Sequence, residues 1–269
     1  MGIGEPVDRL VADWLDYLAH ERNLSANTVA TYARTLRTLS GADTATREDV
    51  EAWARSRSHL SPATRNNELS AVRKFYQWCR IWGHRPETDD PTLRLLGPKM
   101  ASGLPRPISR DDLNRLLDTL KGDLRRTVCL GAYAGLRVSE AAAQVWEDVD
   151  VENRRVRVTG KGQKTRLVGL SSLLLDSLLP DTGGSVVTAG ETPYTAGTLQ
   201  RKVNRAIEAA GVDVTYHQLR HRFGTVALGA SGNLLAVSRA MGHSSPATTA
   251  IYAATSDSDL DVIAEAVTR

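Results

Sequence analysis

The first 85 residues carry hydrophobic side chains at helical spacing. Leu10, Val11, Trp14, Leu15 and Leu18 are separated by alternate steps of one and three positions, which places them on one face of an amphipathic helix. Three further segments repeat the pattern, and two of them open near a serine that can cap a helix N-terminus. The pattern predicts a four-helix bundle over residues 1–85. The four segments are VDRLVADWLDYLAHER, LSANTVATYARTLRTL, TREDVEAWARSR and LSPATRNNELSAVRKFYQWCRIWG.

The hydrophobic pattern stops at residues 86–107, where proline and glycine become frequent and basic residues are scattered. This composition predicts an interdomain linker. Residues 108–269 then form a second domain, in which helical periodicity resumes after Ser109. Gly135 is expected to end a helix. Helices are expected over ISRDDLNRLLDTL, residues 124–134, 195–210, 217–229, 233–241 and 246–254, and SDLDVIAEAV near the end of the chain.

One stretch of the second domain, RRVRVTGKGQKTRLVGL, alternates hydrophobic and polar residues with the period of a strand. Val156 and Val158 alternate with arginine, and a Gly-Lys-Gly turn leads to Leu167 and Val168. This predicts a β-hairpin. The expected fold class is therefore mainly α: a helical bundle followed by a mostly helical α+β domain with a small antiparallel sheet.

The composition argues against a membrane-spanning or secreted protein. The sequence has no run of 18 apolar residues, so no membrane span is expected, and its N-terminus lacks the pattern of a signal peptide. Cys79 and Cys129 stand in apolar helical patterns and are expected to be free, buried thiols, as in a reducing cytoplasm.

The charge balance favours an anionic partner without identifying it. The net charge is +3, and six of the 34 basic residues are lysine, which leaves 28 arginines. Arginine binds phosphate through two parallel hydrogen bonds, so the excess suits a phosphate-rich partner. Codon usage in a GC-rich genome explains the excess equally well.

Two stretches place cationic side chains in connections between elements. Arg137 in AYAGLRVSE lies between Gly135 and Ser139, which can begin the next helix. Lys161 lies in the hairpin turn of TGKGQKTR, between two glycines that let the backbone approach another polymer closely. A P-loop is excluded because its spacing is absent. Taken singly, each stretch is better explained in a simpler way: Arg137 as a solvated loop arginine, and the Lys161 turn as an ordinary hairpin turn.

Two later stretches add histidines and a tyrosine. In YHQLRHRFGT, His217, Arg220 and His221 share one helix face, which suits an anion better than a metal because no cysteine or carboxylate stands at ligand spacing. In RAMGHSSPATTAIYAAT, His243 follows a glycine and Tyr252 lies nine residues later. Taken alone, a tyrosine such as Tyr252 on an apolar helix is more often a core side chain than a catalyst.

The ordered set of arginine, hairpin lysine, His-x-x-Arg, Gly-His and tyrosine resembles the tyrosine recombinase (phage integrase) family. The matching text is GLRVSE, GKGQKTR, HQLRHRFGT and MGHSSPATTAIY. The N-terminal segments LSANTVATYARTL and SPATRNNELSAVRKFYQWC resemble the family's core-binding bundle. The resemblance runs from about residue 6 to 255.

The resemblance implies that Tyr252 attacks a DNA phosphodiester, forms a 3′-phosphotyrosyl link and frees a 5′-hydroxyl. Arg137 and Arg220 would clamp the non-bridging oxygens, and His243 would donate a further hydrogen bond. His217 would accept the tyrosine proton. Lys161 would protonate the leaving 5′-oxygen, and Glu140 would orient Arg137. Because the covalent link stores the bond energy, no cofactor and no metal is expected.

The resemblance also suggests a subtype. The helical bundle begins near residue 6, which leaves no room for an arm-binding domain, and Ala253 and Ala254 stand where Xer-type members usually have Thr-His. We therefore expect a compact integrase of a phage or other mobile element, located in the cytoplasm of a prokaryotic or infected host cell and associated with the nucleoid. A cellular Xer-like recombinase, a non-catalytic DNA-binding regulator and a type IB topoisomerase-like activity are the alternatives.

The expected partner is double-stranded DNA at core sites, bound by a homo-tetramer. Leu260, Ile263 and Val267 form an apolar stripe in the tail, which would dock on a neighbouring subunit. An accessory DNA-bending protein is a further candidate partner.

Overall fold

The computed structural model describes residues 8–99, 106–178, 185–189, 192–243 and 247–250. The chain forms two compact units, Met1–Ser102 and Gly103–Arg269. In the part of the chain that the structure describes, no helix is long and apolar enough to cross a membrane.

The N-terminal unit consists of the four predicted helices and one short 3-10 turn. Their bounds are α1 Arg9–His20, α2 Ala26–Leu36, α3 Arg47–Ser56, η1 Arg57–His59 and α4 Pro62–Ile81.

Local signals explain where these helices begin. The side chains of Ser25, Thr46 and Ser61 each accept a hydrogen bond from a backbone N–H in the first turn, which satisfies a donor that has no partner within the helix. Pro62 occupies the first position of α4, where its missing N–H costs nothing. The predicted caps at the start of α2 and α4 are confirmed.

Aromatic side chains fill the core of this unit. Trp14 of α1 packs edge-on against Phe75 of α4, and both are almost fully buried. The Tyr76 hydroxyl donates to the Ala42 carbonyl at 3.0 Å, so its buried polar atom has a partner. Cys79 is a free, buried thiol, as is Cys129 in the other unit.

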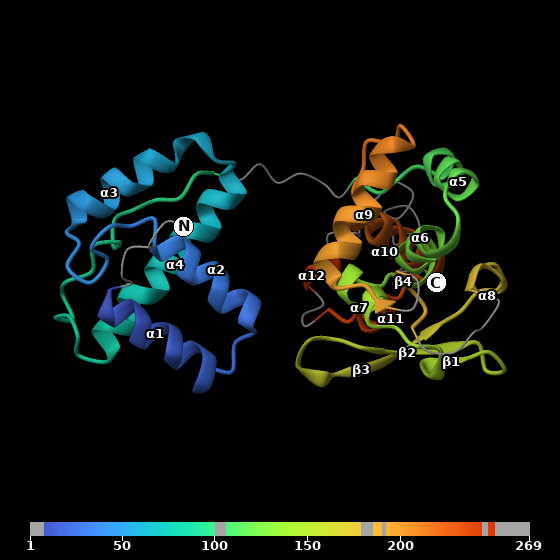
Figure 1. Cartoon of the computed structure of the whole chain (residues 1–269), viewed down its shortest axis with the longest axis horizontal. Helices are drawn as coiled ribbons and strands as arrows, with labels where there is room; N and C mark the ends of the chain where they lie inside the picture. The colour runs from blue at the N-terminus through green and yellow to red at the C-terminus, as the bar shows by residue number, and fades with distance from the viewer. Residues whose placement is uncertain (1–7, 100–105, 179–184, 190–191, 244–246, 251–269) are drawn as a thin grey trace, which may run out of the picture. The chain divides into compact units, whose positions relative to one another are not determined.

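The C-terminal unit is mostly helical, with a small sheet along one side (Figure 1). Its elements are α5 Arg110–Thr119, α6 Gly122–Ala134, α7 Val138–Ala142, η2 Trp146–Asp148, β1 Val149–Asp150, β2 Arg155–Thr159, η3 Lys161–Gln163, β3 Thr165–Gly169, α8 Ser172–Leu178, β4 Thr188–Ala189, β5 Thr192–Pro193, α9 Ala196–Ala209, α10 Tyr216–Ser231, α11 Leu234–Met241 and α12 Ala247–Ala250.

The predicted hairpin is confirmed and is part of a larger sheet. The strands β1, β2 and β3 are antiparallel neighbours in that order, and Val158 of β2 stands opposite Arg166 of β3. The sequence did not predict β1 or the separate β4–β5 pair, because two-residue strands are too short to show alternation. Helix α8, over SLLLDSL, was also not predicted.

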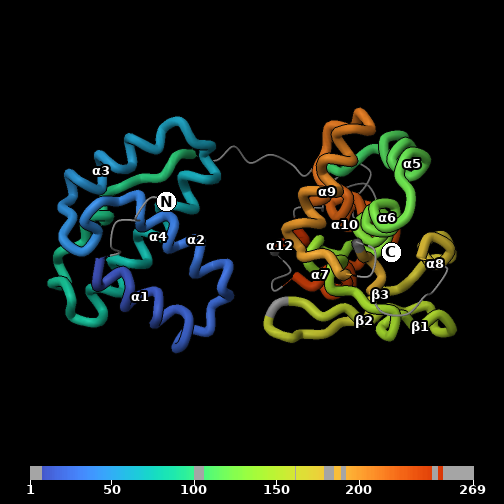
Figure 2. The backbone as a smooth tube through the Cα atoms, viewed as in Figure 1, coloured from blue at the N-terminus to red at the C-terminus, as the bar shows by residue number. Residues whose placement is uncertain are grey.

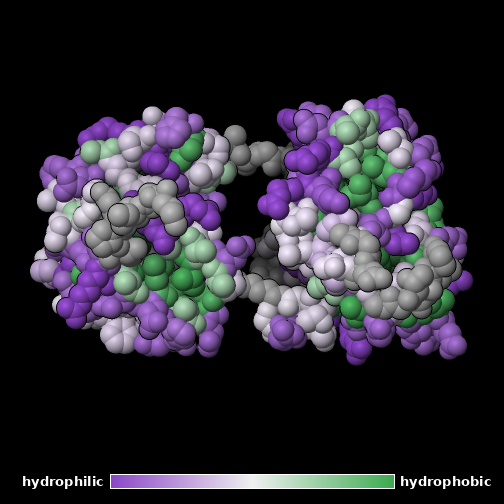
Figure 3. All heavy atoms as spheres, in the orientation of Figure 1, coloured by the Kyte–Doolittle hydropathy of each residue, from purple (hydrophilic) through white to green (hydrophobic). Residues whose placement is uncertain are grey.

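Helices α6 and α10 pack together in the interior of the unit (Figures 1 and 2). Strand β3 packs beside α11. Leu130 of α6 and Leu219 of α10 are fully buried there. On the visible face of each unit, hydrophilic residues surround smaller hydrophobic areas (Figure 3). The expected helix beyond residue 250 and the apolar tail stripe lie outside the described residues.

Candidate active site

The site begins where α6 ends. Gly135 closes that helix in the left-handed region, with φ of 64°, and an added Cβ would lie 2.4 Å from the ring of Phe223. The chain turns there, and Arg137 is the N-cap residue of α7. The Glu140 carboxylate reaches back and accepts a hydrogen bond from the Arg137 backbone N–H at 2.8 Å. Local helix capping therefore fixes Glu140 beside Arg137.

Three guanidinium groups surround the Glu140 carboxylate. Arg137 Nη1 donates to Oε1 at 2.9 Å, and Arg166 donates to both oxygens at 2.9 and 2.8 Å. Arg220 Nη1 lies 3.9 Å from Oε2. Burial would raise the pKa of Glu140, but hydrogen bonds from Arg166 and the Arg137 backbone, together with their charges, hold it below its ordinary value. We name these four residues the Glu140 cluster.

The C-terminal end of α11 completes the cluster. Arg166 Nε donates to the Ala240 carbonyl at 2.7 Å, and Arg220 Nη2 donates to the Met241 carbonyl at 2.6 Å. The last carbonyls of a helix have no partner within it and carry the negative end of its dipole, so they favour cations. Gly242 then turns the chain with φ of 63°.

The Glu140 cluster carries an excess of positive charge. Three guanidinium groups and one carboxylate give these four side chains a sum of +2. Arg220 and Arg166 are largely buried, whereas the Arg137 side chain is 42% exposed. Arg137 Nη2 also donates to the Gly242 carbonyl at 3.0 Å. Buried positive charge of this size favours an anion at the exposed side, and paired guanidinium groups suit phosphate geometry.

Two histidines of α10 lie on the same face as Arg220, as the spacing predicts. The rings of His217 and His221 are 4.4 Å apart, edge to face. Burial and the charge of Arg220 lower the pKa of His217, and burial, His217 and Arg220 lower the pKa of His221 to about 4. At neutral pH both rings are uncharged, so His217 can accept a proton.

His243 follows the turn at the end of α11. Its Nδ1 lies 2.7 Å from the hydroxyl of Thr249, which is fully buried. Burial first, and then the charges of the three arginines and of His217, lower the pKa of His243 to about 4. The positive charges of Arg137 and Arg220 act on both rings, so His217 and His243 lie in the same electropositive part of the site.

The structure thus brings together four of the six residues singled out from sequence: Arg137, His217, Arg220 and His243. The backbone of Lys161 opens η3, the turn between β2 and β3, and its side chain lies outside the described part. Gly160 lies against the Glu140 cluster, because a Cβ added there would be 3.4 Å from Glu140 Oε1. Tyr252 lies outside the described residues.

Sequence reasoning missed Arg166. A signal for it was available. Arg166 lies two positions before the buried Val168, so both side chains point to the same face of the sheet, and Arg166 stands opposite the buried Val158. Alternation therefore placed an arginine at a buried position, where a charge needs a partner. The expected contact between Glu140 and Arg137 is confirmed.

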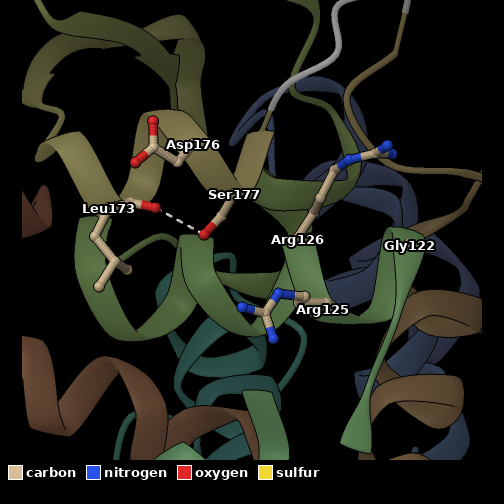
Figure 4. Close-up of a pocket in the computed structure, with 6 residues that line it drawn as sticks. All are labelled: Gly122, Arg125, Arg126, Leu173, Asp176 and Ser177. Carbon is tan, nitrogen blue, oxygen red and sulfur yellow. Dashed lines mark hydrogen bonds between the residues drawn. The ribbon is translucent and has the colours of Figure 1, made fainter. Parts of the chain in front are cut away.

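A pocket elsewhere in the C-terminal unit shares no lining residue with the Glu140 cluster (Figure 4). Its side chains come from α6 and α8, with Arg125, Arg126 and Asp176 among them. Asp123 neutralises Arg126 at 2.9 Å, so this hollow lacks a comparable concentration of charge. The described residues contain no group of three or more His, Cys, Asp or Glu side chains arranged to hold a metal ion.

Comparison with known proteins decides the family. The family model described as "Phage integrase family" matches residues 106–259, and the "Phage integrase, N-terminal SAM-like domain" model matches residues 11–81. The chain belongs to the phage integrase family of tyrosine recombinases. It is therefore a tyrosine-type site-specific recombinase, an enzyme that breaks and rejoins DNA, and its N-terminal unit contains the family's core-binding domain.

Individual relatives cover almost the whole recombinase. Tyrosine recombinase XerC of Xanthomonas campestris pv. campestris (strain B100) is 34% identical over 268 residues, covering 90% of this chain and 83% of the relative. The integrase from mycobacterium phage Brujita is 28% identical, with a TM-score of 0.50 and coverage of 91% and 87%. XerH recombinase bound to palindromic difH substrate in a post-cleavage complex has the same fold, with 21% identity, a TM-score of 0.71 and coverage of 96% and 85%.

Proposed function

We propose that this recombinase is of the cellular Xer type and that it acts on double-stranded DNA core sites through Tyr252. The similarity to XerC over 90% of the chain supports the Xer assignment over the expectation of a mobile-element integrase. The observation that carries the chemistry is the Glu140 cluster, whose four side chains sum to +2 around one buried carboxylate.

In the proposed step, the Tyr252 oxygen forms a bond to the phosphorus as the bond from phosphorus to the 5′-oxygen breaks. The phenol proton passes to His217, which is neutral at pH 7 because burial and Arg220 lower its pKa. Lys161 gives a proton to the leaving 5′-oxygen. A free 5′-hydroxyl and a 3′-phosphotyrosyl link result, and attack by another strand's 5′-hydroxyl reverses the step.

Negative charge develops on the non-bridging oxygens during this step, and the positive charge of the Glu140 cluster would stabilise it. Arg137 and Arg220 supply the clamp, since guanidinium groups held by other bonds need little reorganisation when the charge appears. His243 adds one donor. If the Thr249 hydroxyl donates to Nδ1, the neutral His243 ring carries its hydrogen on Nε2 and can donate it to the phosphate.

The proposed chemistry is tested by covalent capture. Full-length protein is mixed with fragmented genomic DNA of its host, and adducts that survive denaturation are recovered and sequenced. We expect adducts with the wild-type protein and none with Tyr252→Phe, which keeps the ring and lacks the nucleophile. Adducts that survive in Tyr252→Phe would assign the attack to another residue, and their absence from the wild type would refute the proposal.

The captured sequences also test the subtype. A cellular recombinase should recover one chromosomal site unconnected with the recombinase gene. A mobile-element integrase remains the second candidate, supported by Ala253 and Ala254 after the tyrosine and by the similarity to the Brujita integrase. That enzyme should instead recover sites at the borders of an element that contains its own gene.

We further propose a homo-tetramer on DNA, in which the tail with Leu260, Ile263 and Val267 docks on a neighbouring subunit. An apolar helical stripe of this kind gains free energy by burial against a partner. Sedimentation on the captured site should show a tetramer for the full chain and smaller complexes after deletion of residues 256–269. Tetramers that persist after the deletion would remove the tail from this role.

A further inference from the structure

The Arg166 side chain makes more hydrogen bonds than a simple ion pair with Glu140 requires. It is 12% exposed, binds both oxygens of Glu140 and donates through Nε to the Ala240 carbonyl. A guanidinium group has a fixed fork geometry, so these three bonds set its position relative to two separate elements. Lysine offers no such fork.

These bonds tie the β2–β3 hairpin to α7, which begins directly after Arg137, and to α11, which ends just before His243. Through Glu140, Arg166 shares a carboxylate with Arg137, the exposed cation of the cluster. Through Ala240 it holds the end of α11, which Gly242 and His243 follow directly. A Cβ added at Gly242 would lie 2.7 Å from Arg166 Nη1, so that turn is packed against the guanidinium group.

The geometry points to Arg166 as a positioning residue of the strand-cleavage reaction. It fixes the Glu140 carboxylate, which in turn fixes the guanidinium group of Arg137 toward the scissile phosphate. Arg166 itself makes no direct contact with DNA in this assignment. The inference rests on the proposed function, because it assigns Arg137 to the non-bridging phosphate oxygens.

The alternative physical account is that Arg166 merely contributes to stability. The two accounts differ in what Arg166→Lys should do. Lysine keeps the positive charge beside Glu140, but it cannot bridge both carboxylate oxygens and the Ala240 carbonyl together. A stabilising role needs mostly the charge, whereas alignment of Arg137 needs the fork.

The test measures single-turnover cleavage of a nicked suicide duplex that carries the captured site, with full-length protein in excess so that binding is saturated. We expect Arg166→Lys to slow formation of the covalent adduct by about 10- to 100-fold, the effect of a small misalignment of a reacting group. DNA affinity should change by less than about threefold, because phosphate contacts made elsewhere dominate binding.

The matched control is Arg157→Lys. Arg157 lies on the neighbouring strand β2 and forms an ion pair with Asp148 at 2.7 Å, but it does not touch the Glu140 cluster. This variant should cleave at the wild-type rate. Glu140→Gln provides a second variant, which should slow cleavage as Arg166→Lys does, and the double variant should be little slower than either single one, because both changes release the same group.

A substrate with sulfur in place of the leaving 5′-oxygen locates the defect. A thiolate leaves without a proton, so this substrate relieves the loss of a general acid and does not relieve misplacement of the phosphate clamp. We expect the Arg166→Lys defect to persist on it. Full rescue would overturn the assignment to Arg137, and wild-type cleavage by Arg166→Lys on the ordinary duplex would overturn the inference itself. Absence of any wild-type adduct refutes the proposed function instead.

Discussion

Two glycines that both end a helix in the left-handed backbone region offer a direct measurement of how tightly Arg166 is held. Gly232 ends α10 with φ of 61° and Gly242 ends α11 with φ of 63°. An alanine Cβ at Gly232 would meet no atom within 4 Å, whereas one at Gly242 would lie 2.7 Å from Arg166 Nη1. Gly232→Ala therefore reports the backbone cost alone, and Gly242→Ala adds the displacement of Arg166.

The magnitudes follow from these contacts. A left-handed alanine costs roughly 1–2 kcal/mol at either position. To reach an acceptable separation of 3.4 Å, Arg166 Nη1 must also move by about 0.7 Å. A shift of that size strains its 2.9 Å hydrogen bond to Glu140, and the loss of such a charged bond costs about 2–3 kcal/mol. In a domain of this size the added cost corresponds to roughly 4–12 °C in the unfolding midpoint.

Calorimetry of the full chain measures the shift of the transition that responds to each substitution, and adduct formation on the suicide duplex measures the site. Gly242→Ala should unfold at a lower temperature than Gly232→Ala and cleave at least tenfold more slowly, while Gly232→Ala cleaves at the wild-type rate. Equal midpoints and equal cleavage rates would show that Arg166 yields freely, and the reasoning from its contacts would then be wrong.

Three further outcomes are expected from the same environment. The pKa of His221 is about 4 in the folded chain and 6.5 for an ordinary histidine, so the unfolded chain binds more protons between pH 4 and 6.5. Thermal stability should therefore fall as pH drops from 6.5 to 4, and His221→Gln should reduce that fall. Thr249→Val removes the hydroxyl beside His243 and should slow cleavage about five- to tenfold without changing DNA affinity, and an unchanged rate would exclude a role for that contact. Tyr216→Phe leaves the buried Leu136 carbonyl without its hydroxyl donor and should cost about 1–3 kcal/mol by thermal unfolding. Tyr194→Phe serves as control and should cost little, because the hydrogen bond from Lys202 to that hydroxyl is exposed to solvent.

Sequence patterns predicted those parts of the fold whose causes are local. Ser61 and Pro62 mark the start of α4 because capping involves residues of the first turn. Gly135 marks the end of α6 because a left-handed turn favours glycine. The β2–β3 hairpin was found because each strand is five residues long, enough for alternation to show.

The sequence predicted which side chains form the site, but it did not predict the backbone contacts that hold them in place. Motif order identified Arg137, His217, Arg220 and His243, but nothing local indicated that the carbonyls of Ala240 and Met241 would hold the arginines in place. Backbone acceptors carry no residue identity, so contacts of this kind leave no sequence pattern. They arise from the packing of α11 against β3 and α10, which tertiary structure alone determines.

The Glu140 cluster can assemble only after most of the chain has been synthesised. Its hydrogen bonds join residues up to 105 positions apart, from Arg137 to Gly242. A growing polypeptide emerges from its N-terminus, so the helical N-terminal unit is complete long before Arg220 and α11 exist. Until then Arg137 and Arg166 lack the carbonyls that hold them. An interrupted translation product would therefore retain a folded DNA-binding module and have no assembled cutting centre.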